Sequence, residues 1–275
     1  GGRQTSTNYT RGGGAIELRA GLLKLDGVIQ ANGQHQSYYG SGSGGSLLLH
    51  VETLQLGTEA RIEANGSGAT YNYGGGGGGR VALYYGKLIQ GVLHDQVLAK
   101  GGTSYYSQPG AAGSVYLKNT VDNSEELVFN NTNVSASAPP SLLDLSNGSA
   151  YSGKLTLINA VAHLKGEATF SEVVGNNGRL VGSYRNANNE LVVDGVTVEL
   201  DRSGSWAKVR VLNKGVLTTP MASDTFKQGV TITADQIEVD STSRIDVSER
   251  GELGDSSIGN YSGGSYGGNG GVYSG

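Results

Sequence analysis

The sequence predicts an all-β fold, a parallel solenoid in which coils of short strands stack on one another. Three observations carry this prediction. Glycine is far above its average share, similar segments return at a near-constant interval, and apolar and polar residues alternate inside each segment. Alternation with a period of two is the pattern of a strand, and no stretch of useful length has helical spacing.

The composition agrees with a glycine-rich fold that still forms a core. The chain of 275 residues has 47 Gly but only 4 Pro, and no Gly-X-Y period, which excludes collagen. Hydrophobic residues make up 36% and charged residues 16% of the chain, so the sequence can bury a core and is not typical of a disordered protein.

Several partners and chemistries are excluded by the residue counts. With 20 basic and 24 acidic residues and no basic cluster, the chain is not expected to bind nucleic acid. The absence of Cys excludes disulfides, thiolate metal sites and cysteine nucleophiles. No apolar run approaches the roughly 18 residues that a membrane helix needs, so no membrane insertion is expected. The opening Gly1-Gly2-Arg3-Gln4, without Met or a leader sequence, indicates an internal fragment or a processed chain.

The repeat defines the expected strand register. A glycine-rich segment followed by an apolar strand occurs four times, and its equivalent positions are Ile16, Leu47, Val81 and Val115. Two more segments follow in each unit, so that 23–25 matches 54–56 and 29–33 matches 62–66, with 97–101 as a looser third copy. Each unit is therefore expected to have three short strands, and the four equivalent residues should form one inward ladder.

A propeller or a sandwich could also use short strands. In those folds, however, equivalent residues of successive units do not lie directly on one another. In a solenoid each coil contacts only its neighbours, and each Ile or Leu lies on its counterpart one coil below. The similarity of equivalent positions therefore favours the solenoid.

Tyrosines recur in the loops that follow each unit. Tyr39, Tyr73 and Tyr106 return at the interval of the strand repeat, so they keep register with the strands. Rings one coil apart, at about 4.8 Å, could stack on one side of the solenoid. The preferred interpretation is a stabilising row of loops; contact with a sugar ligand is the alternative.

The pattern divides the chain into three parts of one continuous solenoid. Residues 1–118 carry the regular repeat, residues 119–229 are less regular with a loop at 135–140, and residues 230–275 bring back the repeat and its Gly/Tyr-rich loop. Short strands at 155–158, 168–170, 191–193, 196–200 and 209–212 are expected in the middle part.

These motifs resemble glycine-rich repeat regions of very large secreted proteins, of the haemagglutinin-type adhesin kind with a pectin-lyase-like fold. The resemblance covers about residues 1–118 and 230–275 and rests on Gly12-Gly13-Gly14-Ala15-Ile16, Leu25-Asp26-Gly27, Ala31-Asn32-Gly33 and Gly77-Gly78-Gly79-Arg80-Val81-Ala82-Leu83-Tyr84-Tyr85. It implies a right-handed parallel β-helix with its Gly/Tyr-rich loops on one side, and an extracellular structural or adhesive role at the cell surface.

Catalytic and metal sites are not expected. The densest carboxylates, Asp194, Glu199 and Asp201, alternate with apolar residues, which predicts a solvated outer face rather than an acid–base pair. The four histidines lack metal-ligand spacing. No cofactor is expected, although the glycines of residues 251–271 leave a calcium site as an alternative, with Asp255 as the only Asp in that stretch.

The expected function is therefore that of a non-enzymatic segment of a secreted surface fibre built from tandem repeats. Its partners would be neighbouring copies joined end to end, and a surface polysaccharide is a further candidate. The alternative is a carbohydrate-active enzyme or a carbohydrate-binding β-helix.

Overall fold

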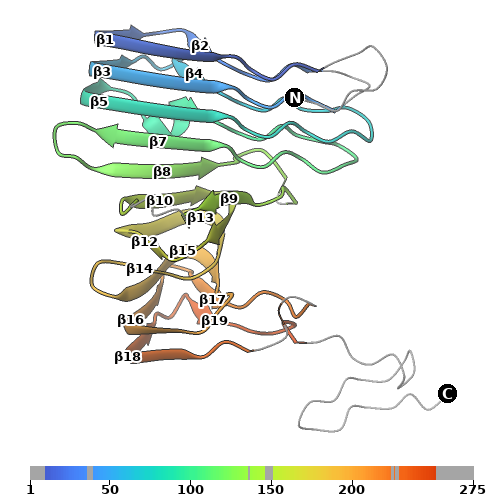
Figure 1. The fold of residues 1–275 in the computed structure, drawn as a ribbon, viewed down its shortest axis with the longest axis vertical. Coiled ribbons are helices and arrows are strands. Elements are labelled where there is room, and N and C mark those ends of the chain that lie inside the picture. Colours follow the sequence, from blue (N-terminus) through green and yellow to red (C-terminus); the bar gives the residue numbers. More distant parts are fainter. Residues whose placement is uncertain are drawn as a thin grey trace.

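The protein is all-β, with one large, mostly parallel sheet. The computed structural model describes residues 10–35, 40–135, 137–145, 151–223, 226 and 229–251. Its elements form an elongated stack with the N-terminal strands at one end and the C-terminal strands at the other (Figure 1). In chain order they are β1 (Ala15–Leu25), β2 (Val28–Gln30), β3 (Ser46–Leu56), β4 (Arg61–Glu63), β5 (Arg80–Gln90), α1 (Leu93–Gln96), β6 (Val97–Leu98), β7 (Ser114–Asn119), β8 (Glu125–Asn130), β9 (Ser141–Asp144), β10 (Lys154–Ile158), β11 (Val161–Lys165), β12 (Ala168–Thr169), β13 (Glu172–Val181), β14 (Tyr184–Arg185), β15 (Glu190–Glu199), β16 (Gly204–Leu212), β17 (Val216–Thr218), β18 (Ile232–Val239) and β19 (Arg244–Ile245).

The large sheet follows the order β1-β3-β5-β7-β8-β10-β13-β15-β16-β18, and β9, β11, β17 and β19 pair beside this path. A separate sheet joins β2, β4 and β6, and another joins β12 and β14. The first four strands on the path are one repeat apart in the chain and the later ones are mostly closer, and a continuous ladder of strand pairs runs the length of the molecule.

The register of the first four strands is the one that the repeat predicts. Ile16 pairs with Leu47, Leu47 with Val81, and Val81 with Val115, all in parallel. The last three side chains are buried. Ile16 is 49% exposed, because β1 is the end strand of the stack and no coil in the described part of the chain covers it.

Two of the three strands expected in each unit join into one. In β3 the inward residues are Leu49 and Val51, then Leu54 and Leu56, so the side-chain alternation shifts between 51 and 54. The strand turns a corner there, and Gly86 occupies the corner in β5. A methyl group on Gly86 would lie 2.5 Å from the carbonyl oxygen of the neighbouring strand, so only glycine fits.

The glycine-rich segments pack into a layer beside this first stack, on the right of β1 to β7 in Figure 1. They run out from the short strands at 31–35, 64–69 and 99–103 and return at 10–14, 40–45, 74–79 and 108–113. Gly76 illustrates the packing. Its N–H donates to Ser67 (2.9 Å), its carbonyl accepts from Gly102 (2.7 Å), and a methyl group on it would lie 2.0 Å from the Gly42 carbonyl oxygen. Three neighbouring segments thus contact one glycine, and a side chain has no room there.

Asparagine side chains form hydrogen bonds with the backbone of neighbouring segments at the edge of this layer. The Asn32 side-chain oxygen accepts the backbone N–H of Asn65, and the Asn65 oxygen accepts that of Lys100, both at 2.7 Å. The buried Asn131 accepts from the Gly101 N–H at 2.8 Å and donates to the Gly110 carbonyl at 3.2 Å. Side chains at the turn thereby satisfy backbone groups that the strands leave unpaired.

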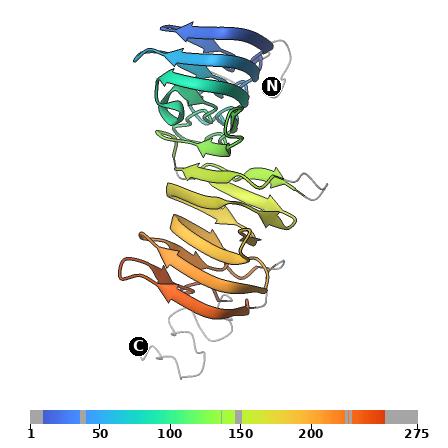
Figure 2. The same cartoon turned by 90° about the vertical axis from the view of Figure 1, so that its left-hand side faces the viewer.

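Among the described strands on the main path the direction reverses once, between β7 and β8, which the sequence reasoning did not predict. β7 and β8 form a hairpin, with Val115 opposite Val128 and Leu117 opposite Glu126. The strands from β8 to β18 on the main path then run parallel to one another. Residue 118, the end of the expected regular part, lies in β7 next to this reversal, while the strands after residue 230 pair with β16 and β17. The molecule therefore consists of a first stack, β1 to β7, and a second stack, β8 to β19, visible as two bodies in Figure 2.

The core changes to the other face of the sheet at the same place. Val128 belongs to the core of the first stack and its neighbour Phe129 to the core of the second. Successive strand residues point to opposite faces, so the two cores lie on opposite sides of the sheet. The strand direction and the side of the core thus change together between β7 and β8.

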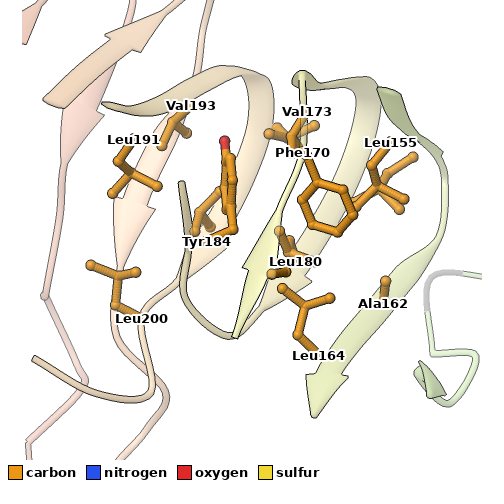
Figure 3. Packing of buried hydrophobic residues seen from close by; sticks show 14 of the residues in the cluster. Leu155, Ala162, Leu164, Phe170, Val173, Leu180, Tyr184, Leu191, Val193 and Leu200 are labelled. Carbon is orange, nitrogen blue, oxygen red and sulfur yellow. The ribbon is translucent and has the colours of Figure 1, made fainter. Parts of the chain in front are cut away.

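The second core is built from aliphatic and aromatic side chains on successive strands, including Leu155, Phe170, Leu180, Tyr184 and Leu191 (Figure 3). All five strands expected in the middle part of the chain are present, in β10, β12, β15 and β16. The loop expected at 135–140 lies between β8 and β9, where residue 136 is not described. Residues 252–275, with the expected loop and the alternative calcium site, lie outside the described residues.

Candidate functional site

The reversal creates a groove where the two stacks meet. The core of the first stack ends at β7, and the outer face of the second stack begins beside it on the same side of the sheet. The resulting step encloses about 790 Å³. Apolar residues of the first stack form one side, and the charged outer residues of β8, β10 and β13 form the other. The lining includes Tyr85, Leu93, His94, Glu126, Lys154 and Glu172.

Register places the charged residues in one row. Glu126 is the strand partner of Lys154, and Lys154 is the partner of Glu172. The Lys154 ammonium lies 3.8 Å from Glu126 Oε1 and 3.6 Å from Glu172 Oε2. From the other side, His94 on α1 places Nε2 3.0 Å from Glu126 Oε2, while Thr156 donates its hydroxyl to Glu126 Oε1 at 2.5 Å. Glu126 is therefore the centre of the network.

The network favours the charged form of both His94 and Glu126. The hydrogen bond that His94 donates to Glu126 raises the pKa of His94 above its usual value. Burial on its own would raise the pKa of Glu126, but hydrogen bonds from His94 and Thr156 outweigh burial and lower it. A carboxylate whose two oxygens already accept hydrogen bonds, and whose pKa is lowered, is a poor general acid.

The arrangement is better suited to binding than to proton transfer. Its lining carries Glu125, Glu126 and Glu172 against one cation, Lys154, and a histidine. Serine hydroxyls in the lining and the half-exposed Glu172 offer hydrogen-bond partners, while the apolar side could contact the flat face of a sugar ring. The excess of carboxylates disfavours an anionic ligand.

The carboxylates that the sequence singled out lie elsewhere. Asp194 accepts from the Asn213 side chain (2.8 Å), and Asp201 pairs with the adjacent Arg202 (3.0 Å). Glu199 corrects the expectation of a solvated face, since it is buried at 3% exposure between Arg179 (3.1 Å) and Arg250 (3.4 Å). The two arginines compensate its charge, which explains how an acidic residue can be buried next to Val198 and Leu200.

The loop tyrosines are only partly described. Tyr39 lies outside the described residues, while Tyr73 and Tyr106 are 38% and 69% exposed. The Ser104 hydroxyl donates to the Tyr73 carbonyl at 2.8 Å, which ties the two loops together. The ring of Tyr106 contacts Tyr105 within its own loop, with centroids 4.4 Å apart. A stacked row of the three predicted tyrosines stays a prediction.

A different aromatic row, on the strands, was missed. From the outer face of the first stack into the second core, neighbouring ring centroids lie 4.6, 5.6, 6.3, 6.0 and 5.7 Å apart, along His50, Tyr84, Tyr116, Tyr151, Phe170 and Tyr184. Burial, with the charge of Glu125, raises the pKa of Tyr116 to about 12. The row passes from outside to inside because the core changes sides. Sequence reasoning missed this row because Tyr151, Phe170 and Tyr184 do not continue the repeat interval.

The described residues contain no group of three or more His, Asp or Glu side chains placed to hold a metal ion. Among them no helix is long and apolar enough to cross a membrane. Comparison of the chain with protein-family models, curated proteins and solved structures finds no match.

Proposed function

We propose that this chain is a non-enzymatic segment of a secreted surface fibre, built as a right-handed parallel β-helix whose copies join end to end. The single ladder of strands through both stacks is the observation that supports it most. Such a ladder resists extension along its length because each coil is hydrogen-bonded to the next.

The ends of the stack are consistent with joining. In the described part of the chain, β1 has β3 as its one strand partner and β18 has β16. Free strand edges pair readily with other strands. Joining can be covalent, in a longer tandem polypeptide, or non-covalent, in a filament.

Sedimentation velocity and electron microscopy of the purified chain, from micromolar to millimolar concentration, test the non-covalent form. Linear species that lengthen with concentration are expected, and a strict monomer throughout would exclude that form. The covalent form predicts neighbouring copies in the coding sequence. A start codon and signal peptide directly before Gly1, with a stop directly after Gly275, would exclude it.

The groove favours a second candidate function, carbohydrate binding. Its carboxylates and hydroxyls suit a neutral oligosaccharide better than pectate or alginate, whose own carboxylates they would repel. Calorimetric titration with neutral and uronic oligosaccharides tests this candidate. Lys154→Ala should weaken binding, while Lys165→Ala, which removes a lysine paired with Asp144 outside the groove, should not. Product formation from any of these polymers would instead support the carbohydrate-active enzyme.

A further inference from the structure

The last described coil has the sequence of a first-stack coil. Residues 232–246 align with residues 49–63 without a gap, mostly through residues of similar type rather than identical ones. Apolar residues correspond to apolar residues at every inward strand position, and Arg244-Ile245-Asp246 corresponds to Arg61-Ile62-Glu63. Yet this coil belongs by its pairing to the second stack, since β18 pairs with β16 and β19 with β17.

The structures of these coils agree with the sequence match. In β18 the inward positions are Ile232 and Ala234 and then Ile237 and Val239, next to Trp206, Val209 and Val211 of β16. The alternation therefore shifts between 234 and 237, at the same place as between 51 and 54 in β3. A coil with the same corner and the same third strand can accept a first-stack coil as its next neighbour.

Within the described part of the chain, the two ends also leave matching apolar side chains exposed. At the end formed by β18 and β19, Ile237, Val239 and Ile245 are 48%, 41% and 45% exposed. At the end formed by β1 and β2, the inward Leu18, Leu23 and Ile29 are only partly buried. Residues of this kind are fully buried one coil further in, where Leu49, Leu54 and Ile62 are each 0% exposed.

We infer that β18 of one copy pairs in parallel with β1 of the next, so that 232–239 lie beside 18–25, with Ile232 on Leu18, Ile237 on Leu23 and Ile245 on Ile29. The partner is a second copy of this chain, and the inference rests on the proposed function. The register follows from two observed ones: residues 18–25 pair with 49–56, and 49–56 are the counterparts of 232–239. β18 thus takes the place of the coil before β1.

Cysteine cross-linking tests the register, and the chain has no Cys of its own to interfere. Thr233 and Arg19 would lie directly opposite on the outer face, about 4.8 Å apart, within the reach of a disulfide. Asp235 would be two residues further along, about 8 Å from Arg19 and too far to bridge. These outward, exposed positions are not needed for the core.

Mild oxidation of a mixture of Arg19→Cys and Thr233→Cys chains should give about tenfold more cross-linked dimer than a mixture of Arg19→Cys and Asp235→Cys chains. Equal yields from the two mixtures, when the chains do associate, would overturn the register and leave the fibre standing. If the separate chains stay monomeric, the same pairs are placed in a tandem duplication of the full chain, with Arg19→Cys in the second copy and its partner substitution in the first. No preference for the 233/19 pair there would refute the inference for the covalent array as well.

Discussion

Two adjacent glycines provide a direct test of the glycine layer. Gly76 lies between three segments, and a methyl group on it would lie 2.0 Å from the Gly42 carbonyl oxygen. A methyl group on Gly77 would have no atom within 4 Å. Neither glycine has a positive φ angle. Gly76→Ala and Gly77→Ala therefore add the same group to neighbouring positions and differ only in whether there is room for it.

The expected loss for Gly76→Ala can be worked from its contacts. Carbonyl oxygen and methyl carbon must move apart by more than an ångström, which strains three hydrogen bonds: Gly76 to Ser67, Gly102 to Gly76, and Ser67 to Gly42. Each contributes about 0.5–1.5 kcal/mol, so the free energy of unfolding should fall by about 3 kcal/mol. At about 2–4 °C per kcal/mol, the melting temperature should fall by about 6–12 °C. Gly77→Ala should be neutral or stabilise by up to about 1 kcal/mol, because alanine restricts the unfolded chain.

Thermal and urea unfolding followed by circular dichroism measure both variants. Hydrogen exchange adds a local measurement, since the Gly102 amide donates to the Gly76 carbonyl and should exchange faster in Gly76→Ala only. Matching melting temperatures and matching exchange in the two variants would refute the claim that the layer is closely packed. A large loss in both would mean that lack of space is not the reason for glycine at these positions.

Three further outcomes are expected. Because the pKa of His94 is raised, its contribution to stability is complete below its ordinary pKa of 6.5 and disappears as the pH rises through the raised value. Glu126, whose pKa is lowered, contributes fully above its ordinary pKa of 4.5. The melting temperature of the wild type should therefore exceed that of His94→Gln by the largest margin between pH 4.5 and 6.5. Glu199→Gln should lower the free energy of unfolding by about 3 kcal/mol, because it leaves two arginines without their buried partner. The matched control is Glu238→Gln, since Glu238 also contacts two cations but is exposed to solvent. That change should leave the urea unfolding midpoint almost unchanged. Serine in place of all three loop tyrosines should lower the melting temperature; an unchanged melt with loss of sugar binding would assign the tyrosines to a ligand instead.

The repeat made the first stack predictable. A parallel coil must place equivalent residues on one another, so the spacing of Ile16, Leu47, Val81 and Val115 along the chain translates directly into strand register. The corner could not be read in advance, because a shift of alternation inside β3 resembles the end of one strand and the start of the next.

The repeat could not predict the strand reversal or the groove beside it. Leu127, Val128 and Phe129 are three consecutive apolar residues, a pattern typical of a strand that is covered on both faces, and this was the one available signal. The groove depends on the register between β8, β10 and β13, where no repeat relates the residues. Glu126, Lys154 and Glu172 are far apart in sequence, and only the pairing of their strands brings them together.

The change of side has a consequence for a fibre that can be measured. Within one copy the strands reverse and the core crosses the sheet once, between β7 and β8. If β18 continues in parallel into β1 of the next copy, that copy begins with the opposite strand direction and the opposite core side. A half-turn about the fibre axis is the rotation that reverses the strand direction and moves the core to the other side at the same time. Successive copies should therefore be related by about half a turn, in addition to the twist of the sheet.

The axial rise follows from the main path of the sheet, which has ten strands per copy. At about 4.8 Å per strand, each copy should advance the fibre by about 48 Å, and the strand direction and core side should return after two copies, about 96 Å, apart from the twist of the sheet. The glycine layer should then project alternately from opposite sides. Helical analysis of electron micrographs, of filaments or of a tandem polypeptide, measures both values. A rise of the expected size without a half-turn would contradict the parallel joint. In that case β1 of the next copy would run opposite to β18, and the joint would have to be antiparallel.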